Sequence, residues 1–188
     1  MVDSNCEGGL SKVHEAAGEL YQLAALMLGD ETTAADLVET VVTKADIDPC
    51  ADAETSVNAA RIDLIETAVA HLSRANPAAF NAPAASANSG GCIDDDDLSS
   101  AGISSAQLAE MVNGPGRRTL RDWLNRLPVA QRTVFVERAI LGWDNATAAA
   151  SLSKAAARKW QPRQVSDTFR TALCSLATSL VHAAASQA

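Results

Sequence analysis

The chain has 188 residues, and its 15 Lys and Arg side chains against 23 Asp and Glu give a formal net charge of −8. Its 38 alanines and an aromatic content of only 4% favour helices and argue against a predominantly β fold. An apolar content of 47% argues against wholesale disorder, and the negative charge taken alone argues against a protein that binds a polyanion.

Three stretches near the start of the chain have apolar residues at helical spacing. The predicted helices cover residues 11–28, a segment that ends at 44, and residues 53–74. Gly29 follows the first helix as a C-cap glycine would, and Thr32 or Thr33 can cap the second. One side of the third helix carries Val57, Ala60, Leu64, Ala68 and Leu72. We expect these three helices to bury a small common core.

Residues 75–105 differ in composition from the rest of the chain. They hold two prolines, three glycines, many Ser, Asn and Ala residues, and the run Asp94 to Asp97. Burial of such a segment offsets little of its chain entropy, so we predict a flexible acidic linker. Consecutive carboxylates on a flexible segment do not converge on one ion, so no metal site is expected there.

Helical signals resume after this linker. The predicted helices cover residues 117–126, 128–141, 146–160 and 162–184, with Gly142 ending the second of them. Pro128 and Pro162 suit the first turn of a helix, and Trp123, Trp143 and Trp160 suit packing anchors. The predicted fold is therefore all-α. It has two small helical bundles, residues 1–74 and 106–188, joined by a flexible linker, residues 75–105.

The charge is distributed unevenly between the two halves of the chain. Residues 1–100 carry 4 basic and 18 acidic side chains, a net charge of −14. Residues 101–188 carry 11 basic and 5 acidic side chains, a net charge of +6. The objection to a polyanionic partner therefore does not apply to the C-terminal half.

The four cysteines and the apolar stretches indicate the cellular compartment in which the protein is expected. Cys6, Cys50, Cys92 and Cys174 are far apart, and no pair has the close spacing of a zinc or redox motif. We therefore expect reduced thiols in a bacterial-type cytoplasm. Residues 1–9 lack the pattern of a secretory signal, and residues 171–188 are too polar to span a membrane, so no membrane partner is expected.

Two sequence motifs carry a family resemblance. Residues 20–45 read LYQLAALMLGDETTAADLVETVVTKA, and residues 124–143 read LNRLPVAQRTVFVERAILGW. In this order they resemble motifs of the bacterial sigma factors, specifically the compact two-domain extracytoplasmic-function type. The first motif matches at Leu20, Tyr21, Leu23, Ala24, Leu28, Gly29, Asp30, Ala34, Asp36, Leu37, Val38 and Ala45. The second matches at Leu124, Leu127, Pro128, Gln131, Arg132, Val134, Phe135, Arg138 and Gly142.

The resemblance implies a C-terminal helix-turn-helix whose recognition helix starts at Pro162. The residues expected to contact promoter DNA are Lys154, Arg158, Lys159, Arg163, Gln164 and Arg170, since Arg and Gln can pair with base edges and Lys with phosphates. The segment between Gly142 and Gln164 is longer than in the family. Either the first helix of the motif is extended, or the turn begins at Ala157 and the earlier alanines are an insertion.

The resemblance also implies contact with core RNA polymerase through the helix that carries Asp36, Leu37, Glu39 and Val41. Glu39 and Thr40 replace the Gln-Glu pair of the family, which alters that surface. The helix at residues 53–74 has no aromatic side chain on which unpaired bases could stack, so promoter opening by this helix is not expected.

The function that we predict is a sigma-factor-like transcription regulator that binds promoter DNA, with core polymerase as a further candidate partner. The alternative is a sigma-factor mimic that binds an anti-sigma or other regulatory protein without binding DNA. A third class is a helical interaction protein with no transcriptional role. No enzyme activity, cofactor or metal is expected, because there is no phosphate-binding glycine loop and Gly18 replaces the second histidine of a zinc-protease motif at His14.

Overall fold

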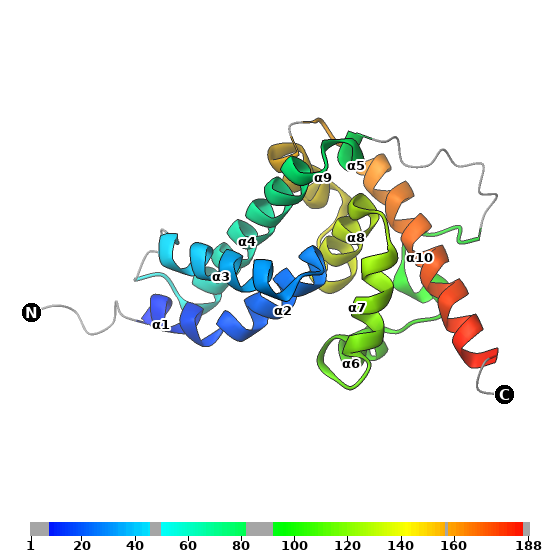
Figure 1. Cartoon of the computed structure of the whole chain (residues 1–188), viewed down its shortest axis with the longest axis horizontal. Helices are drawn as coiled ribbons and strands as arrows, with labels where there is room; N and C mark the ends of the chain where they lie inside the picture. The colour runs from blue at the N-terminus through cyan, green and yellow to red at the C-terminus, as the bar shows by residue number, and fades with distance from the viewer. Residues whose placement is uncertain (1–7, 46–49, 82–91, 157, 186–188) are drawn as a thin grey trace, which may run out of the picture. The chain divides into compact units, whose positions relative to one another are not determined.

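The computed structural model describes residues 8–45, 50–81, 92–156 and 158–185 (Figure 1). All regular secondary structure in these ranges is helical, which confirms the predicted all-α class. The chain divides into two compact units, residues 1–72 and 73–188. Each unit is described by itself.

The first unit is built from four helices: α1 (Gly8–Glu15), α2 (Ala17–Leu28), α3 (Glu31–Lys44) and α4 (Ala53–Ala75). The single helix predicted at residues 11–28 is interrupted at Ala16. The cap of α3 is Asp30 rather than Thr32 or Thr33, because its carboxylate accepts a 2.7 Å hydrogen bond from the backbone N–H of Thr33.

The turn between α2 and α3 lets these two helices lie side by side. Gly29 has φ of 77°, and its N–H donates to the carbonyl of Ala25, as predicted for a C-cap glycine. Apolar residues of α2, α3 and α4 are buried, and the side chains of Ala24, Met27, Ala34, Leu64, Ile65 and Ala68 have almost no exposed surface. All three predicted helices therefore contribute buried apolar side chains.

The second unit contains α5 (Pro77–Asn81), η1 (Leu98–Ala101), α6 (Ser105–Asn113), α7 (Arg117–Arg126), α8 (Val129–Phe135), η2 (Val136–Ile140), α9 (Asn145–Ala155) and α10 (Pro162–Ala185). The predicted bounds agree closely for α7 and α10. The helix predicted at 128–141 ends in a π-helical turn, η2, before Gly142, whose φ is 69°. The helix predicted at 146–160 stops at Ala155.

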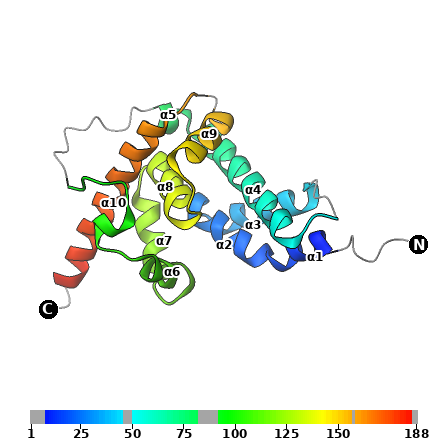
Figure 2. The same ribbon diagram turned by 180° about the vertical axis from the view of Figure 1, so that it is seen from behind.

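α10 is the helix on which the second unit is assembled, and it packs against α8 and α9 (Figure 2). The ring of Phe135 lies between two aromatic neighbours, with its centroid 4.9 Å from Trp123 and 6.0 Å from Phe169. Trp123 also donates its indole N–H to Ser175 at 3.3 Å. Trp123 and Trp160 are buried as packing anchors, whereas Trp143 is half-buried.

Parts of the segment predicted as linker are folded into the second unit. Phe80 of α5 is fully buried, and η1 lies beside α10 with Ala101 and Ile103 buried (Figure 1). These contacts place the described parts of residues 75–105 on the second unit.

The expectation of reduced thiols is wrong for this structure. Cys92 and Cys174 form a disulfide with their Cα atoms 5.7 Å apart. Cys50 is disulfide-bonded as well, and Cys6 lies outside the described residues. Cysteines 82 residues apart can meet in this way because folding, not sequence spacing, brings them together.

None of the described helices is both long enough and apolar enough to cross a membrane.

Candidate nucleic-acid interface

Ser153 holds the end of the connection between α9 and α10, residues 156–161. Ser153 Oγ accepts a 2.8 Å hydrogen bond from the backbone N–H of Trp160 and donates at 2.6 Å to the carbonyl of Ala149. The indole of Trp160 is buried, so the end of the connection is anchored to the body of the unit. This connection has six residues, longer than the three or four of a usual helix-turn-helix turn. One of the two predicted registers begins the turn at Ala157, which lies outside the described residues.

The predicted DNA-contacting residues fall into two groups. Lys154 at the end of α9, Lys159 in the connection and Arg163 in the first turn of α10 are exposed. Arg158 is half-buried and donates to the carbonyl of Phe80 at 3.4 Å, so it ties the connection to α5. The three exposed residues place positive charges at the end of α9, in the connection and at the start of α10.

Gln164 and Arg170 are engaged within the protein. The side-chain oxygen of Gln164 accepts a 2.9 Å hydrogen bond from the backbone N–H of Gln161 and so caps the start of α10. Arg170 bonds to the carboxylate of Asp167 and donates at 3.2 Å to the backbone carbonyl of Asp94. Both side chains, predicted to contact DNA, therefore already have hydrogen-bond partners within the second unit.

The segment Cys92–Asp97, here called the acidic strap, lies on the second unit. Asp96 is its most closely held residue, because its carboxylate accepts a 2.6 Å hydrogen bond from the side-chain amide of Asn145. Its backbone carbonyl accepts from Arg138 at 3.2 Å, and the same guanidinium lies 3.8 Å from its carboxylate. The bond from Asn145, with help from Ser166 and Arg138, lowers the pKa of Asp96 below its usual value.

Sequence reasoning missed Arg138 and Asn145 as residues that organise this surface. Arg138 lies over the ring of Phe169 at 5.2 Å and donates to the carbonyl of Trp143 at 2.5 Å. It belongs to the second motif of the resemblance, which is the only sequence signal that pointed to it. Nothing in the sequence pairs Asn145 with an aspartate 49 residues away.

Glu137 is a fully buried carboxyl in the π-helical turn η2. Ser151 donates to its Oε1 at 3.0 Å, whereas Oε2 has no hydrogen-bond partner. Burial raises the pKa of Glu137 from 4.5 to about 8, and the bond from Ser151 offsets only part of this rise. Glu137 is therefore protonated at neutral pH.

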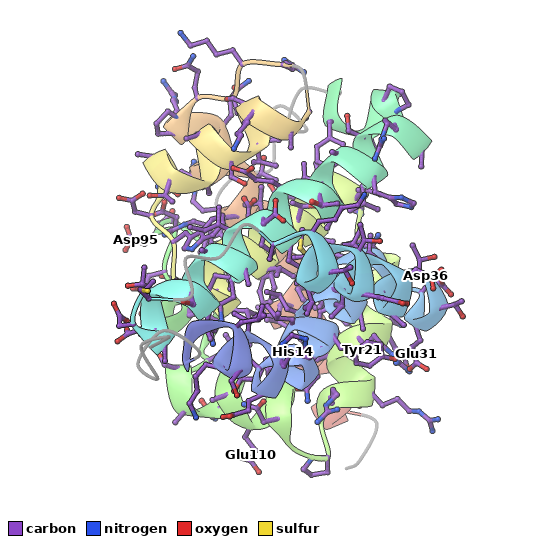
Figure 3. All side chains as sticks on the ribbon, turned by 90° about the vertical axis from the view of Figure 1, so that its left-hand side faces the viewer. His14, Tyr21, Glu31, Asp36, Asp95 and Glu110 are labelled. Carbon is purple, nitrogen blue, oxygen red and sulfur yellow. A yellow bond between two sulfur atoms is a disulfide. The ribbon has the colours of Figure 1, made fainter. Side chains whose placement is uncertain are left out.

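The predicted polymerase-binding residues on α3 also separate into two pairs. Leu37 and Val41 face the core and are 8% and 2% exposed. Asp36 and Glu39 are exposed, and Figure 3 shows Asp36 at the outer surface of α3. Of the four predicted residues, the two acidic side chains are therefore available to a partner, and the two apolar side chains are not.

A shallow cavity in the first unit is lined by residues of α1, α2 and α4, including Val57. Two ion pairs lie at its lining: Lys12 bonds to Glu15 at 2.6 Å, and Arg61 bonds to Glu19 at 2.9 Å. Within the described residues, no group of three or more His, Cys, Asp or Glu side chains is arranged to hold a metal ion. The second unit therefore has the stronger claim to a binding surface.

Comparisons with protein-family models, with curated proteins and with solved structures give no match to this chain.

Proposed function

We propose that the chain is a sigma-factor-like transcription regulator whose second unit binds DNA with the surface formed by the end of α9, the connection and the start of α10. The observation that carries the proposal is the exposure of Lys154, Lys159 and Arg163 on consecutive parts of an anchored helix–connection–helix segment. Cations at such a segment can neutralise phosphates, and an Arg in the first turn of a helix can reach base edges in a major groove.

The anchoring of the connection supports this assignment. The bond from the Trp160 N–H to Ser153 and the buried indole of Trp160 fix the backbone directly after Lys159. Little order then has to be gained when DNA binds, because the backbone that presents the cations is already fixed. A helix-turn-helix with a lengthened turn is the arrangement that we propose for α9 and α10.

The proposal is tested by titrating the whole chain with a mixed-sequence DNA duplex at several salt concentrations. The two lysines proposed to neutralise phosphates, Lys154 and Lys159, predict a slope of log K against log salt of about −1.8, since each contributes about −0.9. Lys159→Ala should reduce the magnitude of this slope by about 0.9 for every sequence alike.

Arg126→Ala is the matched control, because Arg126 is exposed on α7 and lies outside the proposed surface. It should leave the slope unchanged. Arg163→Ala should in addition reduce the difference in affinity between a sequence selected for tight binding and the mixed-sequence duplex. Absence of measurable binding at low salt would contradict the proposal.

One observation favours a second function, a sigma-factor mimic that binds an anti-sigma-type protein and not DNA. Two residues suited to base reading, Gln164 and Arg170, are occupied by contacts within the protein. For the mimic, a pull-down from a bacterial lysate should return a small anti-sigma-type protein without polymerase subunits. Recovery of the polymerase subunits would favour the first function and a contact through Asp36 and Glu39.

A further inference from the structure

We propose that the acidic strap holds the second unit in a state of low DNA affinity, and that reduction of the Cys92–Cys174 disulfide releases its outer half, residues 92–95. This inference rests on the proposed DNA-binding function and assigns a redox control to the same surface. It is carried by the path of the strap along α10, by the charges that the strap presents and by the covalent bond that fixes it.

The strap runs along α10 in the opposite direction to the helix. Cys92 is joined to Cys174, the carbonyl of Asp94 accepts from Arg170, and Asp96 bonds to Ser166 and Asn145. Successive contacts thus step back along α10 toward its first turn. The strap ends at η1, which also lies beside α10.

These contacts share a face of α10 with the residue proposed to read bases. Positions 163, 167, 170 and 174 are spaced by four, three and four residues, and this spacing places them on one face of an α-helix. Arg163 stands at the start of that face and the disulfide lies further along it, at Cys174. A duplex that approaches Arg163 therefore approaches the strap as well.

The strap adds negative charge where phosphates would lie. The side chains of Asp94 and Asp95 are exposed, and Figure 3 shows Asp95 at the edge of the molecule. Asp167 also lies on this face, where it pairs with Arg170. Like charges next to a phosphate backbone oppose binding, and they do so most strongly at low salt, where screening is weak.

The disulfide is the strongest attachment of the outer half of the strap. Without it, residues 92–95 are joined to α10 by the bond from Arg170 to the carbonyl of Asp94, and the Arg170 side chain is 36% exposed. Single contacts at such exposure contribute little. The inner half stays attached through Asp96 and through the buried side chains of Ala101 and Ile103.

The release step is a thiol–disulfide exchange with a dithiol reductant. A thiolate of the reductant attacks Sγ of the exposed Cys92, and Cys174 leaves as a thiolate that takes up a proton. The second thiol of the reductant then attacks the mixed disulfide. The products are two protein thiols and the oxidised reductant, a transfer of two electrons.

The test compares DNA affinity of the whole chain in its oxidised form, after treatment with a dithiol, and as the variants Cys174→Ser and Cys50→Ser. The probe is the mixed-sequence duplex at low salt. Reduction and Cys174→Ser should each lower the dissociation constant for the duplex about three- to tenfold. This gain in affinity should become smaller as the salt concentration is raised. Cys50→Ser, which removes the other disulfide, should bind like the oxidised protein and still respond to the reductant.

A second variant leaves the disulfide in place, so its result does not depend on how well Cys174→Ser folds. Asp94→Asn combined with Asp95→Asn should tighten binding by the oxidised protein, whereas the exposed Asp122→Asn on α7 should not. Equal affinity of the oxidised, reduced and Asn-substituted forms would overturn the redox control and leave DNA binding intact. If no form binds DNA at low salt, the proposed function falls and this inference falls with it.

Discussion

The carboxyl group of Glu137 lies in the interior of the second unit with one hydrogen bond, from Ser151. Placing a charge there would be costly, so the protonated form is favoured. Because its pKa is raised from 4.5 to about 8, the folded protein keeps a proton in this interval that the unfolded chain releases. The unfolded state therefore binds fewer protons, and stability must fall as pH rises through this window.

Glu137→Gln tests this residue directly. As pH rises from 4.5 to 8, Glu137 should lower the free energy of unfolding of the wild type by up to about 1.4 kcal/mol per pH unit. The variant, which cannot ionise at this position, should lack that contribution. Free energies of unfolding from denaturant titrations at several pH values measure it.

Glu110→Gln is the matched control for that experiment, because Glu110 is exposed on α6. This variant should show the same fall in the free energy of unfolding with rising pH as the wild type. Identical pH profiles for the wild type and Glu137→Gln would contradict the assignment of a neutral, buried carboxyl.

At the scale of single elements, sequence periodicity predicts where most of the long helices lie. It does not always predict the residue at which a helix ends. α7 and α10 have nearly the predicted bounds, because Gly116 and Pro128 flank α7 and Pro162 begins α10. α9 stops at Ala155 although alanines continue, since the Ser153 hydroxyl takes the backbone N–H of Trp160. A tertiary contact of this kind overrides propensity and is not visible in the sequence.

Ser153→Ala tests what fixes the connection. The backbone N–H of Trp160 would lose its acceptor, and the second unit should lose about 1–3 kcal/mol of stability. DNA affinity should also fall, since Lys159 would no longer be held in place. Thermal or denaturant unfolding and the duplex titration together check this. Unchanged stability would contradict the role given to Ser153.

α6 was missed although the sequence held a signal for it. Ser104 and Gln107 form a capping box: the Gln107 N–H donates to the Ser104 hydroxyl at 3.2 Å, and the Ser104 N–H donates to the Gln107 side chain at 2.8 Å. The Ser-x-x-Gln spacing is typical of a helix start. The Ser-rich and Gly-rich composition just before it concealed the pattern.

Ser104→Ala should therefore cost about 1 kcal/mol, because α6 loses the side chain that caps it. Ser105→Ala, one residue inside the helix and also exposed, is the control and should be neutral or slightly stabilising. Equal stabilities of the two variants in a denaturant titration would count against the cap.

At the scale of the molecule, the net charge of −8 combines an acidic first unit with a second that carries most of the basic residues. The sequence gives this asymmetry, the all-α class and the candidate cations Lys154, Lys159 and Arg163. The engagement of Gln164 and Arg170 and the disulfide of Cys92 with Cys174 depend on partners 3 to 82 residues away in the chain. Only the folded chain reveals such pairings.

The most direct test of DNA binding by the second unit is a nuclear magnetic resonance titration of the isotope-labelled chain with the mixed-sequence duplex. Backbone signals should shift at the end of α9, in the connection and in the first turns of α10, and these shifts should grow after reduction of the disulfide. Signals that shift only on α7 or in the first unit, or no shifts at low salt, would contradict it.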